Sequence, residues 1–214
     1  IAGVSALTMA ISAYGFSQEI SHFSAAGDTA AARIAEFADG DRSPGLSSIT
    51  QAAFLRDCRN AIIAQAGLDL PQAQRGALQN ACSNGALAIT LSNPASSLAW
   101  MTAAHAKLAS GNYLAANIDL EKSYRTGPNE GWVALLRAEL VELNYSRIAR
   151  GLLPHHDHDL TMILTNRDRD FVAGLFVAHP ESRERITTLA DTLPEPDKVR
   201  FLHSVQRLMA RAKQ

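Results

Sequence analysis

The segment from Trp100 to Asn129 constrains the fold of this chain more than any other part of the sequence. Apolar residues recur at helical spacing after Trp100, and a second helical segment runs from about Leu114 to Thr126. Between the two lies Gly111-Asn112-Tyr113, whose glycine allows the left-handed backbone conformation that such a turn needs. Pro128 ends the segment, and Pro94 lies 34 residues earlier. These features predict a pair of antiparallel helices within a repeating all-α architecture.

The same residues resemble the signature of the tetratricopeptide repeat (TPR), in which small residues at the helix crossing let two helices approach closely. The residues that define the repeat here are Trp100, Ala104, Gly111, Tyr113, Ala116 and Pro128. Ala103, Lys107 and Ser123 depart from the family pattern. The match covers one complete repeat, and its register carried back from Pro94 gives only a degenerate one. The resemblance implies an all-α, TPR-like stack of antiparallel helical hairpins that binds a protein partner.

The chain divides by composition into four regions. We expect residues 1–20 to be an apolar segment that ends a membrane anchor, and residues 21–45 to be a helix and a linker. Residues 46–150 are expected to form the TPR-like hairpins, and residues 151–214 to form C-terminal capping helices. Within the second region, Asp28 is expected to be the N-cap of a helix that reaches Ala38.

The composition favours helices and excludes some classes of partner. The 214 residues are 47% hydrophobic, and the formal net charge is −1. Without an excess of positive charge, no overall field attracts nucleic acid. Gly-rich phosphate loops and the nucleophile elbow of hydrolases are both absent from the sequence. We therefore expect a protein that is not an enzyme, with no catalytic residues, no cofactor and no nucleic-acid partner.

The first charged residue of the sequence is Glu19. The 18 uncharged residues before it lie at the lower limit of what spans a bilayer, which suggests the end of an inner-membrane anchor. The competing interpretation is a packed first helix in a cytoplasmic TPR adaptor, because Val4, Leu7 and Ile11 recur at helical spacing.

The two cysteines provide a second indication of cellular compartment. Cys58 falls in a helix expected from about Thr50 to Gln65, and Cys82 in one from about Pro71 to Leu91. The short connection between these helices favours an antiparallel hairpin, in which the two thiols can form a disulfide. A disulfide is typical of exported proteins and would place the domain in the periplasm. The alternative is two free, buried thiols in a cytoplasmic protein.

The order of these features resembles that of small single-pass, repeat-containing proteins of bacterial envelope polysaccharide systems. The resemblance rests on the apolar start, the cysteine-bearing hairpin and the run from Gly127 to Trp132. It implies an accessory or scaffolding role in polysaccharide synthesis or export, with another envelope or membrane protein as partner.

Two sets of residues are candidates for a functional site. In TPR-like stacks the first helix of each hairpin lines the concave face, which gives a candidate binding surface on two helices. Its members are Thr102, His105, Lys107, Arg137 and Glu139. The alternative is a metal-dependent binder or enzyme that uses His155, His156 and His158, because imidazoles and nearby carboxylates can bind transition metals. The simpler interpretation is a polar helix start, with Asp157 or Asp159 as N-cap of a helix from Leu160.

Overall fold

The computed structural model describes residues 9, 12–17, 19 and 29–211. The membrane anchor expected at residues 1–20 therefore lies mostly outside the described residues. Within them, no helix is both long and apolar enough to cross a membrane.

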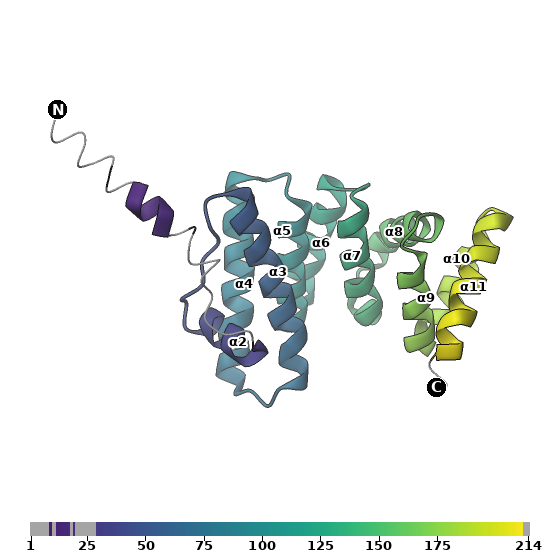
Figure 1. Ribbon diagram of the computed structural model, residues 1–214, viewed down its shortest axis with the longest axis horizontal. Coiled ribbons are helices and arrows are strands. Elements are labelled where there is room, and N and C mark those ends of the chain that lie inside the picture. The colour runs from purple at the N-terminus through teal and green to yellow at the C-terminus, as the bar shows by residue number, and fades with distance from the viewer. Residues whose placement is uncertain (1–8, 10–11, 18, 20–28, 212–214) are drawn as a thin grey trace. The chain divides into compact units, whose positions relative to one another are not determined.

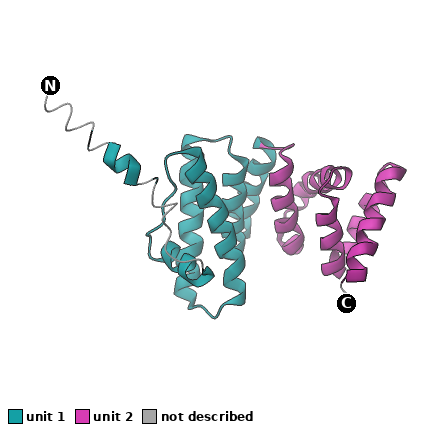
Figure 2. Cartoon of the chain, viewed as in Figure 1, with its two compact units in different colours: residues 1–126 teal, residues 127–214 magenta. Residues whose placement is uncertain are grey.

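The described part of the chain is all-α and contains no strand, which confirms the expected fold class (Figure 1). It forms two compact units, Ile1–Thr126 and Gly127–Gln214 (Figure 2). In unit 1 the helices are α2 Ala30–Ala38, α3 Ser48–Ala64, α4 Gln72–Ser92, α5 Ser97–Ala109 and α6 Tyr113–Thr126, with a 3₁₀ turn η1 Gln65–Gly67. In unit 2 they are α7 Gly131–Leu143, α8 Leu153–Thr165, α9 Arg169–Ala178, α10 Arg183–Ala190 and α11 Glu195–Arg211, with 3₁₀ turns η2 Tyr145–Arg147, η3 Arg150–Leu152 and η4 Pro180–Ser182. The expected hairpin region 46–150 crosses the boundary between the units.

Hydroxyl side chains fix the starts of three helices in unit 1. The Ser47 Oγ accepts a hydrogen bond from the amide of Thr50 at 3.2 Å, and Ser96 caps α5 in the same way. Thr29 is the N-cap of α2, one residue after the expected Asp28, because its hydroxyl accepts the bond from the amide of Ala32.

A disulfide between Cys58 and Cys82 joins α3 to α4, as the sequence predicts. Both residues are fully buried, and their Cα atoms are 5.5 Å apart. The core next to them contains Phe37 and Phe54, whose rings meet edge to face with centroids 5.5 Å apart. Gly85 on α4 makes this packing possible, since a Cβ there would lie 2.2 Å from the Phe54 ring. The disulfide and the aromatic pair hold the first helices of unit 1 together.

Helix α5 packs against α3, α4 and α6. Ala104 on α5 and Ala116 on α6 are buried, and Ser123 Oγ donates a hydrogen bond to the Ser97 carbonyl at 2.9 Å. Gly111 has φ +80°, which confirms the left-handed turn between α5 and α6. Tyr113, at the first position of α6, is 40% exposed.

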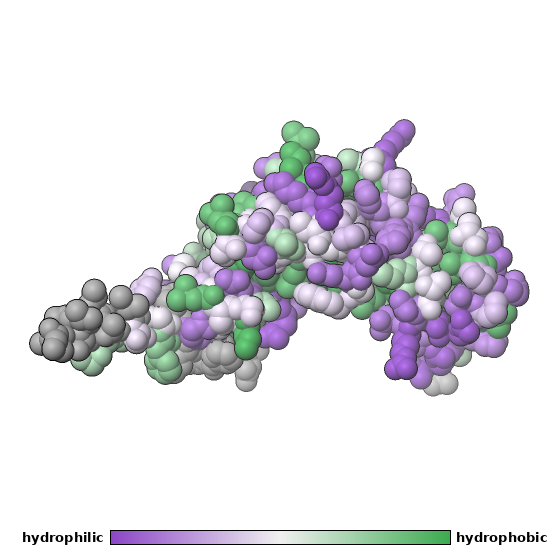
Figure 3. All heavy atoms as spheres, turned by 90° about the horizontal axis from the view of Figure 1, so that it is seen from above, coloured by the Kyte–Doolittle hydropathy of each residue, from purple (hydrophilic) through white to green (hydrophobic). Residues whose placement is uncertain are grey.

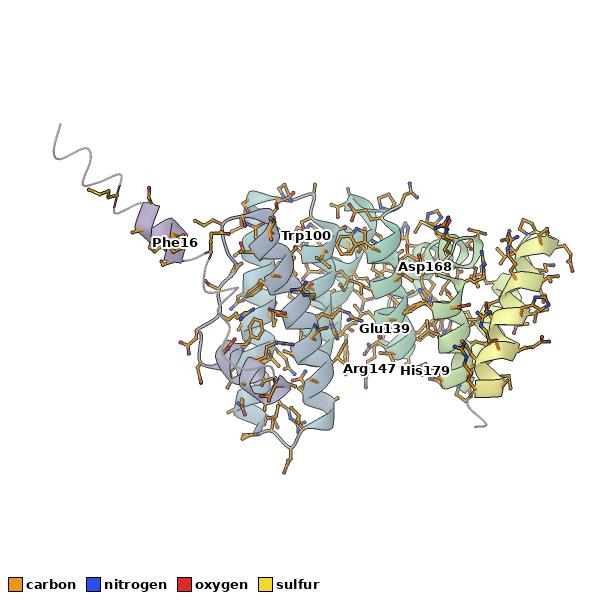
Figure 4. All side chains as sticks on the ribbon, viewed as in Figure 1. Phe16, Trp100, Glu139, Arg147, Asp168 and His179 are labelled. Carbon is orange, nitrogen blue, oxygen red and sulfur yellow. A yellow bond between two sulfur atoms is a disulfide. The ribbon has the colours of Figure 1, made fainter. Side chains whose placement is uncertain are left out.

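Trp100 lies at the N-terminal end of α5 (Figure 4). Its indole Nε1 donates a hydrogen bond to the carbonyl of Pro94 at 2.9 Å. The ammonium of Lys122, on α6, is 4.1 Å from the centre of the indole ring, which is cation–π distance. Trp100 thus connects the loop before α5 to α6.

The largest correction to the expected elements is in unit 2. Helix α8 begins at Leu153 instead of near Leu160, so Asp157 and Asp159 lie inside it and do not cap it. Pro154 occupies its first turn, where the missing amide has no helical partner. The preceding helix, α7, ends at Leu143 and is followed by the two 3₁₀ turns η2 and η3.

Candidate functional site

The three candidate surface residues on α5 are less accessible than the sequence suggests. Thr102 is completely buried, which corrects its assignment to an exposed surface. Lys107 is partly buried and forms an ion pair with Asp119 of α6. His105 is half-buried, and burial, together with the positive charge of Arg59, lowers its pKa to about 4. These positions face neighbouring helices because α5 packs against α3, α4 and α6.

The two candidate surface residues on α7, Arg137 and Glu139, differ in how far they are buried. Arg137 is completely buried, which also corrects its assignment to the surface. Its guanidinium binds the carboxylate of Asp159 through two bonds, Nε–Oδ2 at 2.7 Å and Nη2–Oδ1 at 2.8 Å. Nη1 donates a third bond to the carbonyl of Gly127 at 3.0 Å. Glu139 is half-buried and extends from the same helix (Figure 4). Arg137 is therefore a structural residue, and Glu139 remains a surface candidate.

A second buried polar cluster surrounds Glu142, the last acidic residue of α7. Its Oε1 lies 2.7 Å from Nε2 of His156, and its Oε2 accepts hydrogen bonds from Ser182 and Arg185. The Arg185 guanidinium also stacks over the Tyr145 ring, 3.5 Å from its centre. Among the described residues, Nδ1 of His156 has no hydrogen-bond partner. The carboxylate, and not the serine or the histidine, is the centre of this cluster.

The surroundings of the two buried carboxylates shift their pKa values in opposite directions. Burial raises the pKa of Asp159, although the bonds from Arg137 oppose this rise. Burial also acts to raise the pKa of Glu142, but hydrogen bonds from His156, Arg185 and Ser182 outweigh it and lower the pKa to about 2. Glu142 is therefore an anion held by three donors, which is a poor starting point for a general acid or base.

The three histidines proposed as metal ligands have separate environments along α8. His156 is buried against Glu142, while His155 and His158 are exposed. Nε2 of His158 lies 3.2 Å from the side-chain oxygen of Asn129. Within the described residues, no group of three or more histidine, cysteine or acidic side chains is placed to hold a metal ion.

Unit 2 also contains an open depression of about 500 Å³ beside α10. Three carboxylates and one guanidinium lie in its wall, with threonines and a leucine between them. The lining residues are Asp157, Glu181, Glu184, Arg185, Thr188, Leu189 and Thr192. Since Arg185 is paired with Glu142, the wall of the depression has a negative net charge.

The exposed apolar side chains of unit 1 include a group on α6. Leu114 is 78% exposed and Ile118 is 48% exposed, one helical turn apart on the same face. The same face continues with exposed Glu121 and Arg125. We call these four residues the α6 face. Hydrophobic residues on the surface of the molecule are visible in Figure 3.

Comparison with known protein families, with curated proteins and with solved structures found no match to this chain.

Sequence reasoning missed the buried ion pairs, although helix periodicity could have found one of them. The buried residues of α8 are His156, Asp159, Leu160, Ile163 and Leu164, which is the spacing of a single helix face. Arg137 likewise lies between Val133 and Val141 on the buried face of α7. Oppositely charged residues on the apolar faces of two helices of one unit indicate a buried ion pair. A single charged residue, considered without its position on the helix, suggests an exposed side chain.

The titration of two groups predicts an acid-sensitive fold. Between about pH 6.5 and pH 4 the unfolded chain binds a proton at His105 that the folded protein excludes. The free energy of unfolding therefore decreases as the pH is lowered through this range. Below about pH 4.5, protonation of Glu142 in the unfolded state causes a further loss. Each pKa unit corresponds to about 1.4 kcal/mol, so titration of each group lowers the free energy of unfolding by on the order of 3 kcal/mol. Urea denaturation across this pH range measures the effect.

Two variants identify the contributions of these groups. His105→Gln is expected to flatten the pH dependence above about pH 4.5, and Glu142→Gln to flatten it below. An unchanged slope in both variants would contradict the assignment, whatever their absolute stabilities.

Proposed function

We propose that this protein is a non-enzymatic interaction scaffold built from TPR-like helical hairpins. It acts in the cell envelope, anchored to the inner membrane and facing the periplasm. Its role there is accessory to polysaccharide synthesis or export, through a protein partner of the same envelope system.

The geometry of α5 and α6 supports the repeat-like character. Ala104 and Ala116 are buried where the two helices pack closely, and Gly111 has the left-handed conformation at their turn. The bond from Ser123 to the Ser97 carbonyl shows that even a residue that departs from the family pattern lies at a close helix contact. These features are the ones that the TPR signature requires at the same positions.

The disulfide supports the proposed compartment. Disulfides persist in oxidising environments such as the bacterial periplasm and are rare in the cytoplasm. The Cys58–Cys82 bond is completely buried between α3 and α4, where it is a structural element and not an accessible redox site.

One observation carries the proposal of a scaffold: several charged side chains are buried and paired, while two large apolar side chains are exposed on one face of a helix. Glu142, His156 and Arg137 are buried in ion pairs. Leu114 and Ile118, in contrast, are exposed on one face of α6. Exposed apolar side chains that share a face are typical of protein interaction sites.

The composition of the α6 face suggests the chemistry of the partner. The face is apolar at its N-terminal end, with Leu114 and Ile118, and charged at its C-terminal end, with Glu121 and Arg125. An amphipathic helix with apolar residues at one end and a complementary acid–base pair at the other fits along it. We therefore propose that the partner is a membrane or envelope protein that presents such a helix.

Site-specific cross-linking tests this proposal. A photoreactive residue at position 114 is expected to capture one envelope protein in the native cells, through an amphipathic helix. The double variant Leu114→Ser/Ile118→Ser is expected to weaken binding of that protein roughly 30- to 1,000-fold, because each side chain contributes about 1–2 kcal/mol of apolar burial.

Leu91 provides a matched control, since it is 88% exposed but belongs to α4. Leu91→Ser is expected to leave the affinity unchanged, and a photoreactive residue at 91 to capture no specific partner. Equal capture at positions 91 and 114, or full binding by the double variant, would exclude the α6 face as the interaction site.

A further inference from the structure

Glu19 makes an unusual set of contacts with the start of α3. Its carboxylate accepts hydrogen bonds from the amides of Leu46 at 2.7 Å and Ser47 at 2.8 Å. The hydroxyl of Ser47 donates a third at 2.6 Å, and that of Thr50 a fourth at 3.1 Å. Four donors at the start of α3 thus converge on a carboxylate 27 or more positions earlier in the chain: one from Leu46 before the helix, two from the N-cap Ser47 and one from Thr50 in the first turn. We call these four donor groups the α3 cradle.

The backbone around the cradle is shaped to admit the carboxylate. A Cβ atom at Gly45 would lie 2.0 Å from Oγ1 of Thr50 and 3.3 Å from Oε1 of Glu19. A side chain at position 45 would therefore displace the Thr50 hydroxyl and narrow the space that Glu19 occupies.

Electrostatics favours an anion at this position. The first amides of an α-helix have no partner within the helix and carry partial positive charge, so a carboxylate there is stabilised. The hydrogen bonds from Ser47 and the other donors lower the pKa of Glu19 to about 2. The carboxylate is thus charged, and accepts these bonds, at all physiological pH values.

The described helical segment 12–17, which precedes Glu19 in the chain, is largely exposed. Tyr14 is 65% exposed and Phe16 is 66% exposed in the helical segment 12–17 (Figure 4). The Ser17 hydroxyl bonds to the carbonyl of Tyr14 within this segment. The contacts described between this end of the chain and the helices of unit 1 are those of the Glu19 carboxylate.

We propose that Glu19 is a carboxylate latch, which fastens the helical segment 12–17 to unit 1 by binding the α3 cradle. The latch fixes where the segment leaves the domain without burying its aromatic side chains. These side chains stay available for contacts outside unit 1 while their distance from α3 is set by one residue. The proposal does not depend on the partner of the α6 face.

Solution NMR of the full chain tests the latch with the variant Glu19→Gln. The amides of Leu46 and Ser47 are expected to shift and to lose protection against hydrogen exchange. The heteronuclear NOE values of residues 12–17 are expected to fall to those of a freely moving segment, while those of α3 and α4 stay unchanged. Asp69→Asn is the matched control, since Asp69 is an exposed carboxylate before α4.

Added acetate distinguishes binding of a carboxylate in the α3 cradle from fastening of the segment 12–17. In Glu19→Ala the cradle is empty, so added sodium acetate is expected to return the Leu46 and Ser47 amide signals toward their original positions. Residues 12–17 stay mobile because acetate is not connected to them. Gly45→Ala, which narrows the cradle, is expected to release the segment even with Glu19 present.

Two results would overturn the proposal. The first is that Glu19→Gln leaves the Leu46 and Ser47 amides unchanged, which would show that the carboxylate does not occupy the cradle in solution. The second is that these amides shift while residues 12–17 remain as ordered as before, which would show that Glu19 caps α3 but does not fasten the segment.

Discussion

Replacement of Asp159 by asparagine is expected to lower the free energy of unfolding by about 3–5 kcal/mol. The variant leaves the guanidinium of Arg137 charged, completely buried and without a counter-charge. The cost is dominated by desolvation of that charge, because Arg137 and Asp159 are both completely buried. Urea denaturation at neutral pH measures the change.

A double variant separates this desolvation cost from the net contribution of the ion pair to the free energy of unfolding. Arg137→Met/Asp159→Leu removes both charges and is expected to recover most of the lost stability, since well-packed apolar residues often replace a buried ion pair at little cost. Asp157→Asn, on the same helix but partly exposed, is the control and is expected to change stability by less than about 0.5 kcal/mol. A loss under about 1 kcal/mol in Asp159→Asn would show that the pair is hydrated in solution.

Removal of the disulfide is expected to cost about 3 kcal/mol. The bond joins residues 24 positions apart, and the entropy of closing a loop of that length in the unfolded chain corresponds to roughly this value. The double variant Cys58→Ala/Cys82→Ala keeps an apolar residue at both buried positions, so the measured difference reports mainly on the cross-link. Thermal and urea unfolding of the variant and of the oxidised protein give the comparison.

Thiol labelling extends this prediction to the cell. Protein taken from its native cells with thiols blocked at lysis is expected to resist maleimide under denaturing conditions until it is reduced. Two freely reactive cysteines would contradict both the oxidising compartment and the periplasmic location proposed from it.

Local signals were sufficient to predict most of unit 1 from the sequence. The turn at Gly111 depends on a conformation that only glycine adopts readily. The disulfide depends on two cysteines that lie on either side of the short connection between α3 and α4. The glycine acts at its own position, and the two cysteines, 24 residues apart, lie on consecutive helices joined by a short connection. The start of α5 at Ser96 is likewise a local signal, because the cap is three residues from the amide that it binds.

The candidate surface was harder to predict because burial depends on distant elements. Thr102 is buried on α5, which packs against three other helices. The sequence around Thr102 does not show how many helices pack against α5. The contacts of Glu142 span 14 residues to His156 and 40 to Ser182, so the cluster exists only once α7, α8 and η4 have packed. A TPR-like register also assigns α5 to a concave face, whereas the candidate residues of α5 are buried or half-buried and α6 carries the exposed Leu114 and Ile118.

If the protein is exported as proposed, the position of the disulfide has a consequence for how it matures. Both cysteines belong to consecutive helices of unit 1, and nothing in unit 2 takes part in bringing them together. During N-terminus-first translocation, oxidation can therefore take place as soon as Cys82 has emerged, while the later helices are still on the other side of the membrane. The first hairpin would then be covalently closed before the rest of the chain arrives to pack.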